Sequence, residues 1–377
     1  MTIGILKEPA EERRVSLLPE IAGQLVKMNF EVCVETKAGV TAYASDEDYK
    51  NAGGKICSRE EVLNTDLIIS INRPTDPELQ KMKTGAALLC TFQPLFNKDV
   101  VLKLLEHDIT SFSMDMVPRT TRAQSMDILS SQATVAGYKA VLLAATHLPK
   151  FFPMFMTAAG TITPAKVLIL GAGVAGLQAI ATAKRLGAVV EAFDTRSAVK
   201  EEVKSLGAKF VEVEGAAESA AAGGYAVEQT KEFLEKQKQK IFESASKSDV
   251  IICTAQIPGK KAPLLIAKET VAAMKSGSVI VDLAASSGGN CELTKNNEVI
   301  TTTNGVTIIG NSNVASTVPS DASKMYGKNI MNFLKLMLKD GVMTVNLEDD
   351  IVAGTCITHK KELISQRVKD AMAQQPA

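Results

Sequence analysis

Short apolar runs alternate along the chain with segments of helical periodicity. Runs such as 67–72 and 250–254 hold mostly consecutive apolar residues, which is typical of strands buried on both faces of a parallel sheet. We expect strands at 2–6, 30–36, 67–72, 85–92, 110–113, 167–170, 188–193, 209–212, 250–254, 278–282 and 307–309. Helical periodicity marks 19–28, 98–107, 136–146, 177–186, 228–246 and 323–339. Alternating strands and helices imply right-handed crossovers, so the predicted fold is α/β with parallel sheets.

The expected strands fall into two groups, one on each side of the long apolar helix at 136–146. This grouping predicts two Rossmann-like domains with parallel sheets and a cleft between them. The amphipathic helix at 323–339 is expected to return to the first domain. That domain is then discontinuous, 1–130 plus 320–377, and the second domain spans 131–319.

The segment 166–187 reads as a strand, a glycine turn and a helix. Gly171, Gly173 and Gly176 form G-x-G-x-x-G, and Asp194 ends the next expected strand 18 residues after Gly176. The first glycine permits a tight turn, the second lets backbone N–H groups approach a pyrophosphate, and the third lets the helix pack closely on the strand. The helix N-terminus also attracts phosphates. This register predicts a dinucleotide site, and the alternative is a Rossmann-like fold without a ligand.

Asp194 indicates which dinucleotide is bound. Its carboxylate can accept hydrogen bonds from the adenosine ribose hydroxyls, and its charge repels a 2′-phosphate. The expected cofactor is therefore NAD rather than NADP. Arg196 is the exception in this stretch, because a guanidinium group at that place could pair with a phosphate.

A group of polar residues precedes the long helix at the junction of the two expected domains. Gln124, Asp127 and Ser130 are spaced three apart, which at a helix start places them along one ridge, with Arg119 and Arg122 upstream. Such a ridge could hold the ribose and amide of a nicotinamide nucleotide. The alternative is an ordinary first helical turn with solvated polar side chains.

The segment near 214–227 is rich in alanine and glycine and has almost nothing to bury, so we expect it to be mobile. Gly224 and Tyr225 stand at its tip. A lid that closes over a bound ligand would have this composition. The alternative is an insertion without a function.

Composition excludes several classes of function. The 42 basic and 42 acidic residues balance, so nucleic acid is not an expected partner. The six cysteines contain no C-x-x-C, so we expect neither a metal site nor a disulfide framework, and a reducing cytosol fits. The N-terminus lacks the pattern of a signal peptide. No apolar run reaches the ~18 residues of a spanning helix, so direct membrane insertion is not expected and a membrane partner would be another chain.

The chain offers no evident general base. Its three histidines are His107, His147 and His359, and none follows an expected strand toward the presumed cleft. Oxidation of an alcohol or an amine needs such a base near the reacting carbon. A dinucleotide site without one favours bare hydride transfer between two carriers, in which the protein positions the rings and excludes water.

Several long stretches identify a family resemblance. They are 7–19, 119–132, 156–161, 171–188, 222–226, 257–260 and 286–290, and the second reads Arg-Thr-Thr-Arg-Ala-Gln-Ser-Met-Asp-Ile-Leu-Ser-Ser-Gln. Together they resemble the NAD(H)-binding domain I, or α1 subunit, of proton-translocating NAD(P) transhydrogenase, and the likeness covers essentially the whole chain. The resemblance implies direct hydride transfer between NADH and NADP⁺, coupled to proton movement across a membrane.

The resemblance also implies the roles of particular residues. Arg119, Gln124 and Asp127 match the loop that holds the nicotinamide end and are the expected catalytic residues, and Ser130 matches its carboxamide contact. The other expected cofactor-binding residues are Gly171, Gly173, Val174, Gly176, Asp194, Thr195, Arg196, Gly224, Tyr225, Gln237 and Gln256. Gln124 is expected to reach toward the NADP(H) partner, and Gly224 with Tyr225 matches a loop that closes on NAD.

The partners implied by the resemblance are a second copy of the chain, a membrane-spanning component and an NADP(H)-binding component. NADP is then held by the partner and not by this chain. Because the chain ends at Ala377 without either component, it resembles the form in which domain I is a separate polypeptide. The expected location is the cytoplasmic face of the membrane, held there through the partner.

Alanine dehydrogenase is a related family with the same expected fold, and it supplies the main alternative function. Its catalytic His aligns with Gln93, its catalytic Asp with Ser286 and its substrate Lys with Arg73. These three departures disfavour amino-acid oxidation. A third hypothesis is a module that senses NAD and catalyses nothing.

Overall fold

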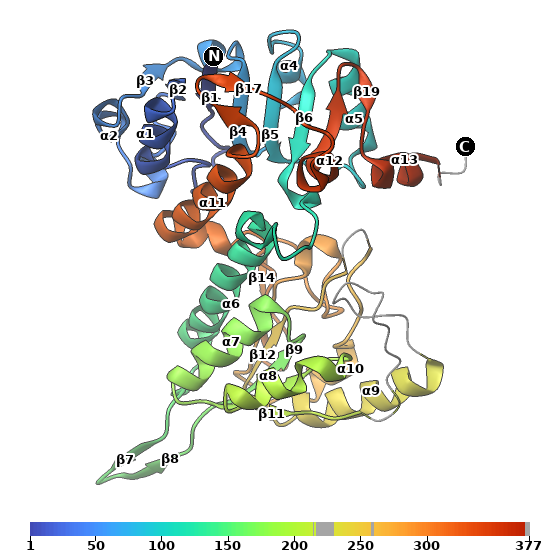
Figure 1. Ribbon diagram of the computed structural model, residues 1–377. Coiled ribbons are helices and arrows are strands. Elements are labelled where there is room, and N and C mark those ends of the chain that lie inside the picture. The colour runs from blue at the N-terminus through green and yellow to red at the C-terminus, as the bar shows by residue number, and fades with distance from the viewer. Residues whose placement is uncertain (214, 216–229, 258–259, 374–377) are drawn as a thin grey trace. The chain divides into compact units, whose positions relative to one another are not determined.

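The computed structural model describes every residue except 214, 216–229, 258–259 and 374–377. The chain divides into two units, residues 1–132 with 316–377 and residues 133–315. Each unit has its own sheet with helices on both faces (Figure 1). The predicted α/β fold with parallel sheets is therefore confirmed.

Unit 1 is built on an eight-stranded sheet with the order β19-β18-β6-β5-β4-β1-β2-β3. The strands are β1 (Thr2–Ile5), β2 (Glu31–Glu35), β3 (Lys55–Cys57), β4 (Leu67–Asn72), β5 (Ala87–Thr91), β6 (Thr110–Ser113), β18 (Cys356–His359) and β19 (Glu362–Leu363). Strands β1 to β6 are parallel, whereas β18 runs antiparallel to β6 and to β19. The C-terminal segment of the chain thus completes a sheet that the N-terminal segment begins.

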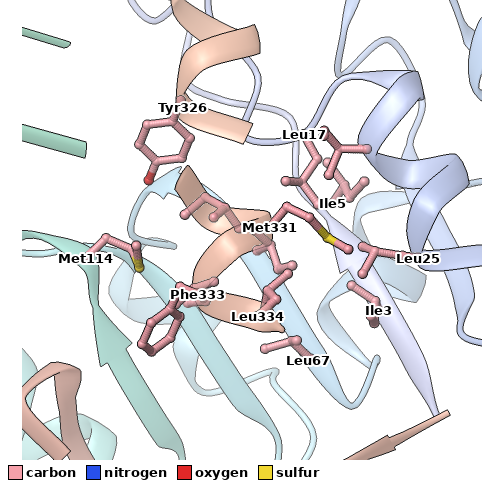
Figure 2. Close-up of a cluster of buried hydrophobic side chains, with 14 of the residues drawn as sticks. Ile3, Ile5, Leu17, Leu25, Leu67, Met114, Tyr326, Met331, Phe333 and Leu334 are labelled. Atoms are coloured by element: carbon pink, nitrogen blue, oxygen red, sulfur yellow. The ribbon is translucent and has the colours of Figure 1, made fainter. Parts of the chain in front are cut away.

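One face of this sheet packs against α1 (Pro19–Lys27), α2 (Asp46–Asn51), α11 (Pro319–Leu334) and α12 (Asp350–Thr355). Alternate strand residues such as Ile3 and Leu67 meet the buried side of α11 in one apolar cluster (Figure 2). Phe333 of α11 is fully buried, and its ring meets Phe112 of β6 edge to face at a centroid distance of 5.7 Å. Burial of such side chains contributes about 1.5–3 kcal/mol each.

The opposite face of the sheet is covered by shorter helices. These are α3 (Arg59–Leu63), α4 (Asp76–Leu79), α5 (Lys98–Glu106) and α13 (Gln366–Ala373). A two-strand hairpin, β16 (Leu338–Lys339) with β17 (Val342–Met343), follows α11. Both faces of the central strands are buried, which accounts for their uninterrupted apolar sequences.

Unit 2 is built on a seven-stranded sheet with the order β11-β10-β9-β12-β13-β15-β14. The strands are β9 (Lys166–Leu170), β10 (Val189–Phe193), β11 (Lys209–Phe210), β12 (Val250–Cys253), β13 (Val279–Asp282), β14 (Val299–Thr301) and β15 (Thr307–Ile309). Only β14 is antiparallel to its neighbour among these described strands. From β9 the chain first adds β10 and β11 on one side of the sheet and then crosses to add β12 and β13 on the other side. Ligands of open α/β sheets bind at such a switch point.

Helices cover both faces of the second sheet. One face packs against α6 (Ile128–His147), α7 (Val174–Arg185) and α8 (Lys200–Ser205), and the other against α9 (Lys231–Ala245) and α10 (Lys268–Ala272). Helix α6 starts in unit 1 and continues into unit 2. A hairpin of β7 (Phe155–Thr157) and β8 (Gly160–Ile162) extends away from the rest of unit 2 (Figure 1).

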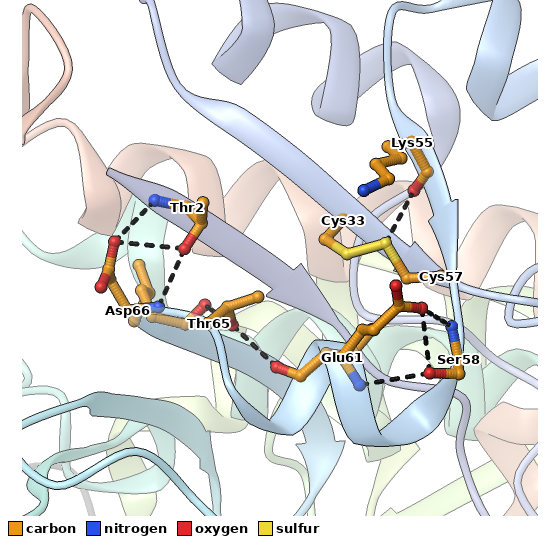
Figure 3. Close-up of a disulfide and its surroundings, with 10 residues drawn as sticks. Thr2, Cys33, Lys55, Cys57, Ser58, Glu61, Thr65 and Asp66 are labelled. Atoms are coloured by element: carbon orange, nitrogen blue, oxygen red, sulfur yellow. Dashed lines mark hydrogen bonds between the residues drawn. A yellow bond between two sulfur atoms is a disulfide. The ribbon is translucent and has the colours of Figure 1, made fainter.

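Cys33 and Cys57 form a disulfide, which corrects the expectation of no disulfide framework. Strands β2 and β3 are parallel neighbours, and their register pairs Cys33 with Lys55. Cys57 is two residues further along, so both sulfurs lie on the same face, with the two Cα atoms 5.9 Å apart (Figure 3). The spacing of 24 residues carries no motif, because the pairing arises from the sheet register alone. Cys90, Cys253, Cys291 and Cys356 are buried free thiols.

Helix α6 also corrects the expectation about apolar length. It has 20 residues and is apolar enough to cross a membrane by length and composition, the one such helix in the described part of the chain. Ala140, Val141 and Ala144 of α6 are fully buried in the core of unit 2. A core helix of a globular protein passes the same length and composition test, so the finding is weak evidence for a membrane span.

Candidate functional site

The glycine turn of unit 2 connects the end of β9 to the start of α7. Gly171 has a φ of +99°, and a Cβ there would lie 2.6 Å from Oγ1 of Thr254. A Cβ on Gly176 would lie 1.9 Å from the carbonyl oxygen of Gly171. Both positions therefore require glycine, one for backbone conformation and contact with the neighbouring strand end, the other for close packing of helix against turn.

Gly173 differs from the other two glycines. It is the N-cap of α7 and has ordinary extended backbone, with φ −78° and ψ −168°. A Cβ placed on it would meet no atom within 4 Å in the part of the chain that the structure describes. Gly173 has no side chain that could accept hydrogen bonds from the first N–H groups of α7, and the positive end of the helix dipole lies there. A helix N-terminus without a side-chain cap, with open space in front of it among the described residues, suits the pyrophosphate of a dinucleotide. Val174, 43% exposed, is the first residue of that helix.

Asp194 follows β10, and its carboxylate joins the turn to the next strand. Oδ2 accepts a hydrogen bond of 2.7 Å from the backbone N–H of Ala172 in the glycine turn. The backbone N–H and Nε of Arg196 both donate to Oδ1 at 2.9 Å, and Nη2 donates to Oδ2 at 2.8 Å. These bonds raise the pKa of Arg196. The guanidinium group is thus held by Asp194, which weakens the expectation that it could serve a 2′-phosphate.

The ends of the neighbouring strands are joined to the same turn. Oγ1 of Thr254, just after β12, donates to the carbonyl oxygens of Leu170 and Gly171 at 3.2 and 2.9 Å. Nε2 of Gln256 donates to the carbonyl oxygen of Leu283, just after β13, at 2.9 Å. The structure therefore gathers Gly171, Gly173, Val174, Gly176, Asp194, Thr195, Arg196 and Gln256 around the carboxyl ends of β9, β10, β12 and β13.

Other expected residues of unit 2 are not part of this group. Gln237 lies on the buried side of α9, between Phe233 and Ile241, and its Oε1 has no hydrogen-bond partner among the described residues. Gly224 and Tyr225, with the expected mobile segment near 214–227, fall outside the described residues apart from Gly215. The lid therefore stays a prediction.

The expected nicotinamide residues of unit 1 lie in the connection between β6 and α6. The prediction of a helical ridge is wrong, because α6 begins only at Ile128. Gln124 starts a short 3₁₀ turn, η3 (Gln124–Met126), and Asp127 follows it in an extended conformation. Oδ1 of Asp127 accepts from the backbone N–H of Ser130 at 3.0 Å, and Oδ2 accepts from the Ser130 hydroxyl at 2.6 Å. Asp127 and Ser130 thus form a cap at the start of α6.

The side chains of Arg119 and Gln124 are exposed on this connection, whereas Asp127 and Ser130 are half-buried. The N–H of Asp127 donates to the carbonyl of Gln124 at 3.4 Å, so Gln124, Asp127 and Ser130 are linked in sequence across two successive turns. The contact between Asp127 and Ser130 is also what the alternative of an ordinary first helical turn predicts. Their binding role stays a prediction.

The three positions compared with alanine dehydrogenase, Gln93, Arg73 and Ser286, also carry no evident general base. Gln93 is an exposed residue in the left-handed region, with φ +48°, and follows the last residue of β5 by two positions. Arg73 pairs with Asp76, its Nη1 lying 2.7 Å from Oδ1. Ser286 is exposed in a 3₁₀ turn after β13. An amide, a guanidinium and a hydroxyl at these positions are poor proton acceptors near neutral pH.

A buried ion pair in unit 1 was not predicted from the sequence. Arg14 donates from Nε and Nη2 to the carboxylate of Glu12 at 2.8 and 2.6 Å, and from Nη1 to Oε1 of Gln132 in α6 at 2.8 Å. The Arg14 and Glu12 side chains are only 10% and 4% exposed. Beside them, burial raises the pKa of Glu8 to about 7. The contact between Arg14 and Gln132 joins segments that are far apart along the chain.

Both halves of the chain match described families. Residues 4–136 match "Alanine dehydrogenase/PNT, N-terminal domain", and residues 140–366 match "Alanine dehydrogenase/PNT, C-terminal domain". The chain is 47% identical over 378 residues to an NAD(P) transhydrogenase subunit alpha protein of Rhodospirillum rubrum, covering 97% of this chain and 98% of that protein.

Two further relatives are a solved transhydrogenase structure and an alanine dehydrogenase. A solved structure of transhydrogenase from Sinorhizobium meliloti is 40% identical, has a TM-score of 0.89, and covers 97% of this chain and 100% of the other. Alanine dehydrogenase of Mycolicibacterium smegmatis is 26% identical over 98% of this chain and 96% of the other. With both family matches in place, the chain belongs to the alanine dehydrogenase/PNT family.

Proposed function

We propose that this chain is the NAD(H)-binding component of a proton-translocating NAD(P) transhydrogenase, and that it passes hydride directly between NADH and NADP⁺ held by a partner component. The observation that carries the proposal is the glycine turn, with open space at Gly173 and with Asp194 bonded to Ala172. The turn occurs in a chain that is 47% identical to a transhydrogenase subunit over nearly its full length.

In unit 2, the residues around the glycine turn would hold the adenosine and phosphate moieties of NAD. The N–H groups at the start of α7 would donate to the pyrophosphate, and Asp194 with Thr195 and Arg196 would contact the adenosine ribose. Gln256 and Gln237 are further proposed contacts. Gly224 and Tyr225 would close over the bound nucleotide.

In unit 1, Arg119, Gln124 and Asp127 would hold the nicotinamide end, and Ser130 would contact its carboxamide. The nicotinamide ring supplies the hydride when NADH is bound. The chain's own residues orient the ring and exclude water, which can lower the barrier by about 7–11 kcal/mol when the geometry is productive. Gln124 is exposed and therefore accessible to a partner component.

The alternative function is oxidation of an amino acid such as alanine. It requires a proton acceptor at the reacting centre, and the family resemblance aligns Gln93 and Ser286 with the His and Asp expected in the dehydrogenases. The identity to an alanine dehydrogenase, 26%, is also well below the 47% identity to the transhydrogenase subunit. We therefore disfavour this alternative.

The proposed function is tested by mixing the chain with a separately prepared NADP(H)-binding component, NADH and an NADP⁺ analogue of distinct absorbance. We expect rapid hydride exchange that needs both proteins. Incubation with NAD and alanine should give no NADH absorbance. Tight NADH binding with no exchange would instead identify a sensing module, and turnover of alanine would establish the dehydrogenase.

The NADP(H)-binding and membrane-spanning components are proposed to be other chains. This chain matches 98% of a relative whose own name describes only one portion of an alpha subunit. Attachment to the cytoplasmic face of a membrane would then come through those partners, and NADP would not bind here.

We further propose that the chain forms a homodimer through unit 2. Helix α6 is apolar enough in length and composition to cross a membrane, yet only 33% of its most apolar stretch is buried. The β7–β8 hairpin is exposed throughout, although it carries Phe155, Met156 and Ile162, and Phe155 packs edge to face on the exposed Phe151. Exposed apolar surface on a hairpin and a helix of one unit is typical of an interface between subunits.

Charged residues on the hairpin should dissociate this dimer. Phe155 and Ile162 face each other across the two strands, so replacing both with glutamate places two charges on one face. We expect the dimer dissociation constant to rise roughly 100-fold, because charge buried in an interface costs several kcal/mol. Sedimentation velocity measures the mass of wild type and variant. Val299→Glu, at a 57% exposed site on β14, is the matched control. A wild-type monomer, or a variant that still dimerises, would contradict the proposal.

A further inference from the structure

The turn that carries Gln124 is anchored in the core on both sides. Ala123 is fully buried and Met126 is 6% exposed, and both belong to the apolar cluster of unit 1. Gln124 and Ser125 lie between these anchors with exposed side chains. Backbone hydrogen bonds close the turn, from the N–H of Met126 to the carbonyl of Ala123 at 2.8 Å and from the N–H of Gln124 to the carbonyl of Thr121 at 3.4 Å. The carbonyl of Ser125 takes part in neither bond, so what holds it must come from outside the turn.

Helix α11 supplies that contact. The carbonyl oxygen of Ser125 accepts a hydrogen bond of 2.8 Å from Nδ2 of Asn329 and one of 3.2 Å from Nδ2 of Asn332. Residues three apart on a helix share a face, so the two amides converge on one acceptor. Their helix is fixed in the core by neighbours on either side, since Ile330 and Phe333 are fully buried. The carbonyl between Gln124 and Met126 is thus held by a rigid element.

Apart from its bond to Ser125, asparagine is an unfavourable residue at position 329 of the helix. It is a weak helix former. The residue is only 8% exposed, and its Oδ1 has no hydrogen-bond partner among the described residues. An unpaired buried acceptor destabilises a fold, and a leucine of similar size would avoid both costs. The bond from Nδ2 to Ser125 is the contact that favours an amide here.

A second attachment holds the same connection further upstream. The Arg122 guanidinium pairs with Asp349 through two bonds of 2.7 Å and also contacts Asp350. Asp349 in turn caps α12 by accepting from the N–H groups of Ile351 and Val352. This pair is half exposed, so we assign it a smaller role than the buried amide.

We propose that Asn329 and Asn332 are positioning residues for hydride transfer, because their amides fix the Ser125 carbonyl and with it the directions of Gln124 and Asp127. The inference rests on the proposed function, in which those two side chains hold the nicotinamide end. Neither asparagine touches the nucleotide in this scheme. Loss of the amides loosens the ring at the reacting end, whereas the adenosine end keeps its contacts with unit 2.

The test compares Asn329→Leu, Asn332→Leu and the double variant with the wild-type full chain. We expect Asn329→Leu to lower kcat for hydride exchange with the NADP(H)-binding component by about tenfold, since small displacements of a reacting group carry large rate penalties. The NADH dissociation constant should change less than about threefold. Asn332→Leu should show a smaller loss because its bond is longer, and the double variant the largest.

Hydrogen exchange of the peptide 119–127 gives a readout that does not depend on catalysis, and it should speed up in the same order as kcat falls. Ser323→Ala is the matched control, because it removes a buried bond of α11, to the N–H of Val15, without touching the turn. An Asn329→Leu chain with wild-type kcat, or with unchanged protection of 119–127, overturns the inference. A kcat loss equalled by Ser323→Ala overturns it too. A wild type without hydride exchange refutes the proposed function, and this inference with it.

Discussion

A chain carrying Gly173→Ala is expected to fold as the wild type does and to bind NADH about 10- to 100-fold more weakly. Alanine adopts the extended backbone of Gly173 without strain, and its Cβ would meet no atom of the described residues within 4 Å. The space is where the pyrophosphate is proposed to approach the N-terminus of α7. A methyl group there would overlap the phosphate, and an overlap of this kind costs about 1–3 kcal/mol, or roughly one to two decades in Kd.

NADH fluorescence titration measures the affinity, and urea unfolding measures the fold. The matched comparison is Gly176→Ala, whose Cβ would lie 1.9 Å from the Gly171 carbonyl oxygen. We expect that variant to lose stability in unit 2 as well as NADH binding, since two backbone segments cannot both stay in place. Unchanged NADH affinity in Gly173→Ala would place the phosphates elsewhere.

The second large effect is expected from Arg14→Met. Removing the guanidinium takes away the ion pair of Arg14 with the Glu12 carboxylate, whose side chain is only 4% exposed. Breaking a buried pair in this way destabilises by about 3–5 kcal/mol at neutral pH. Urea unfolding followed by hydrogen-exchange mass spectrometry reports unit 1 peptides separately from those of unit 2. The loss should be confined to unit 1, and adding Glu12→Leu should recover some of it.

The pH dependence of this loss checks its electrostatic origin. Burial acts to raise the pKa of Glu12, but the bonds and charge of Arg14 outweigh burial and hold it below its usual 4.5. A carboxyl with a lowered pKa stabilises the fold above the pKa of the unfolded chain and loses that contribution as pH falls through the folded pKa. Without the guanidinium, burial raises the pKa of Glu12 in Arg14→Met. The difference in stability between wild type and variant should therefore be largest at high pH, shrink as pH falls through the raised pKa of the variant, and be lost below the lowered pKa of wild type. A difference independent of pH would indicate lost packing instead.

The sequence was most informative where local pattern and tertiary environment agree. Strands buried on both faces, such as β4, β6 and β15, were predicted with their observed bounds because nearly every residue in them is apolar or small. Helix α11 was placed four residues late, since Pro319 and polar neighbours hide its first turn. The β7–β8 hairpin and the antiparallel strands β18 and β19 were missed, because an exposed or antiparallel pair of two to four residues has no distinct periodicity.

The residues of the candidate site also fall into those that local sequence predicts and those that depend on distant contacts. The glycine turn and Asp194 could be located from spacing, since consecutive elements of one βαβ unit determine it. The prediction of a helical ridge was wrong because Asp127 caps α6 instead of lying within it. The same residue types occur at the cap and in the first turn of a helix, so the sequence alone does not distinguish the two positions. Arg14, Thr254 and Asn329 make their contacts with segments that are distant in sequence, and the Cys33–Cys57 disulfide likewise depends on strand register. No local pattern encodes such pairs.

Unit 1 is made of two chain segments separated by unit 2, and this order affects how the chain folds during synthesis. Strands β1 to β6 leave the ribosome first, but α11, α12 and β18, which complete their core and sheet edge, follow only after unit 2. The 183 residues from 133 to 315 take roughly 10–40 s to translate at about 5–20 residues per second. During that interval the contiguous unit 2 can fold, while the first sheet has an uncovered apolar face that aggregation or a chaperone can reach. The unit synthesised second is thus the one able to fold first.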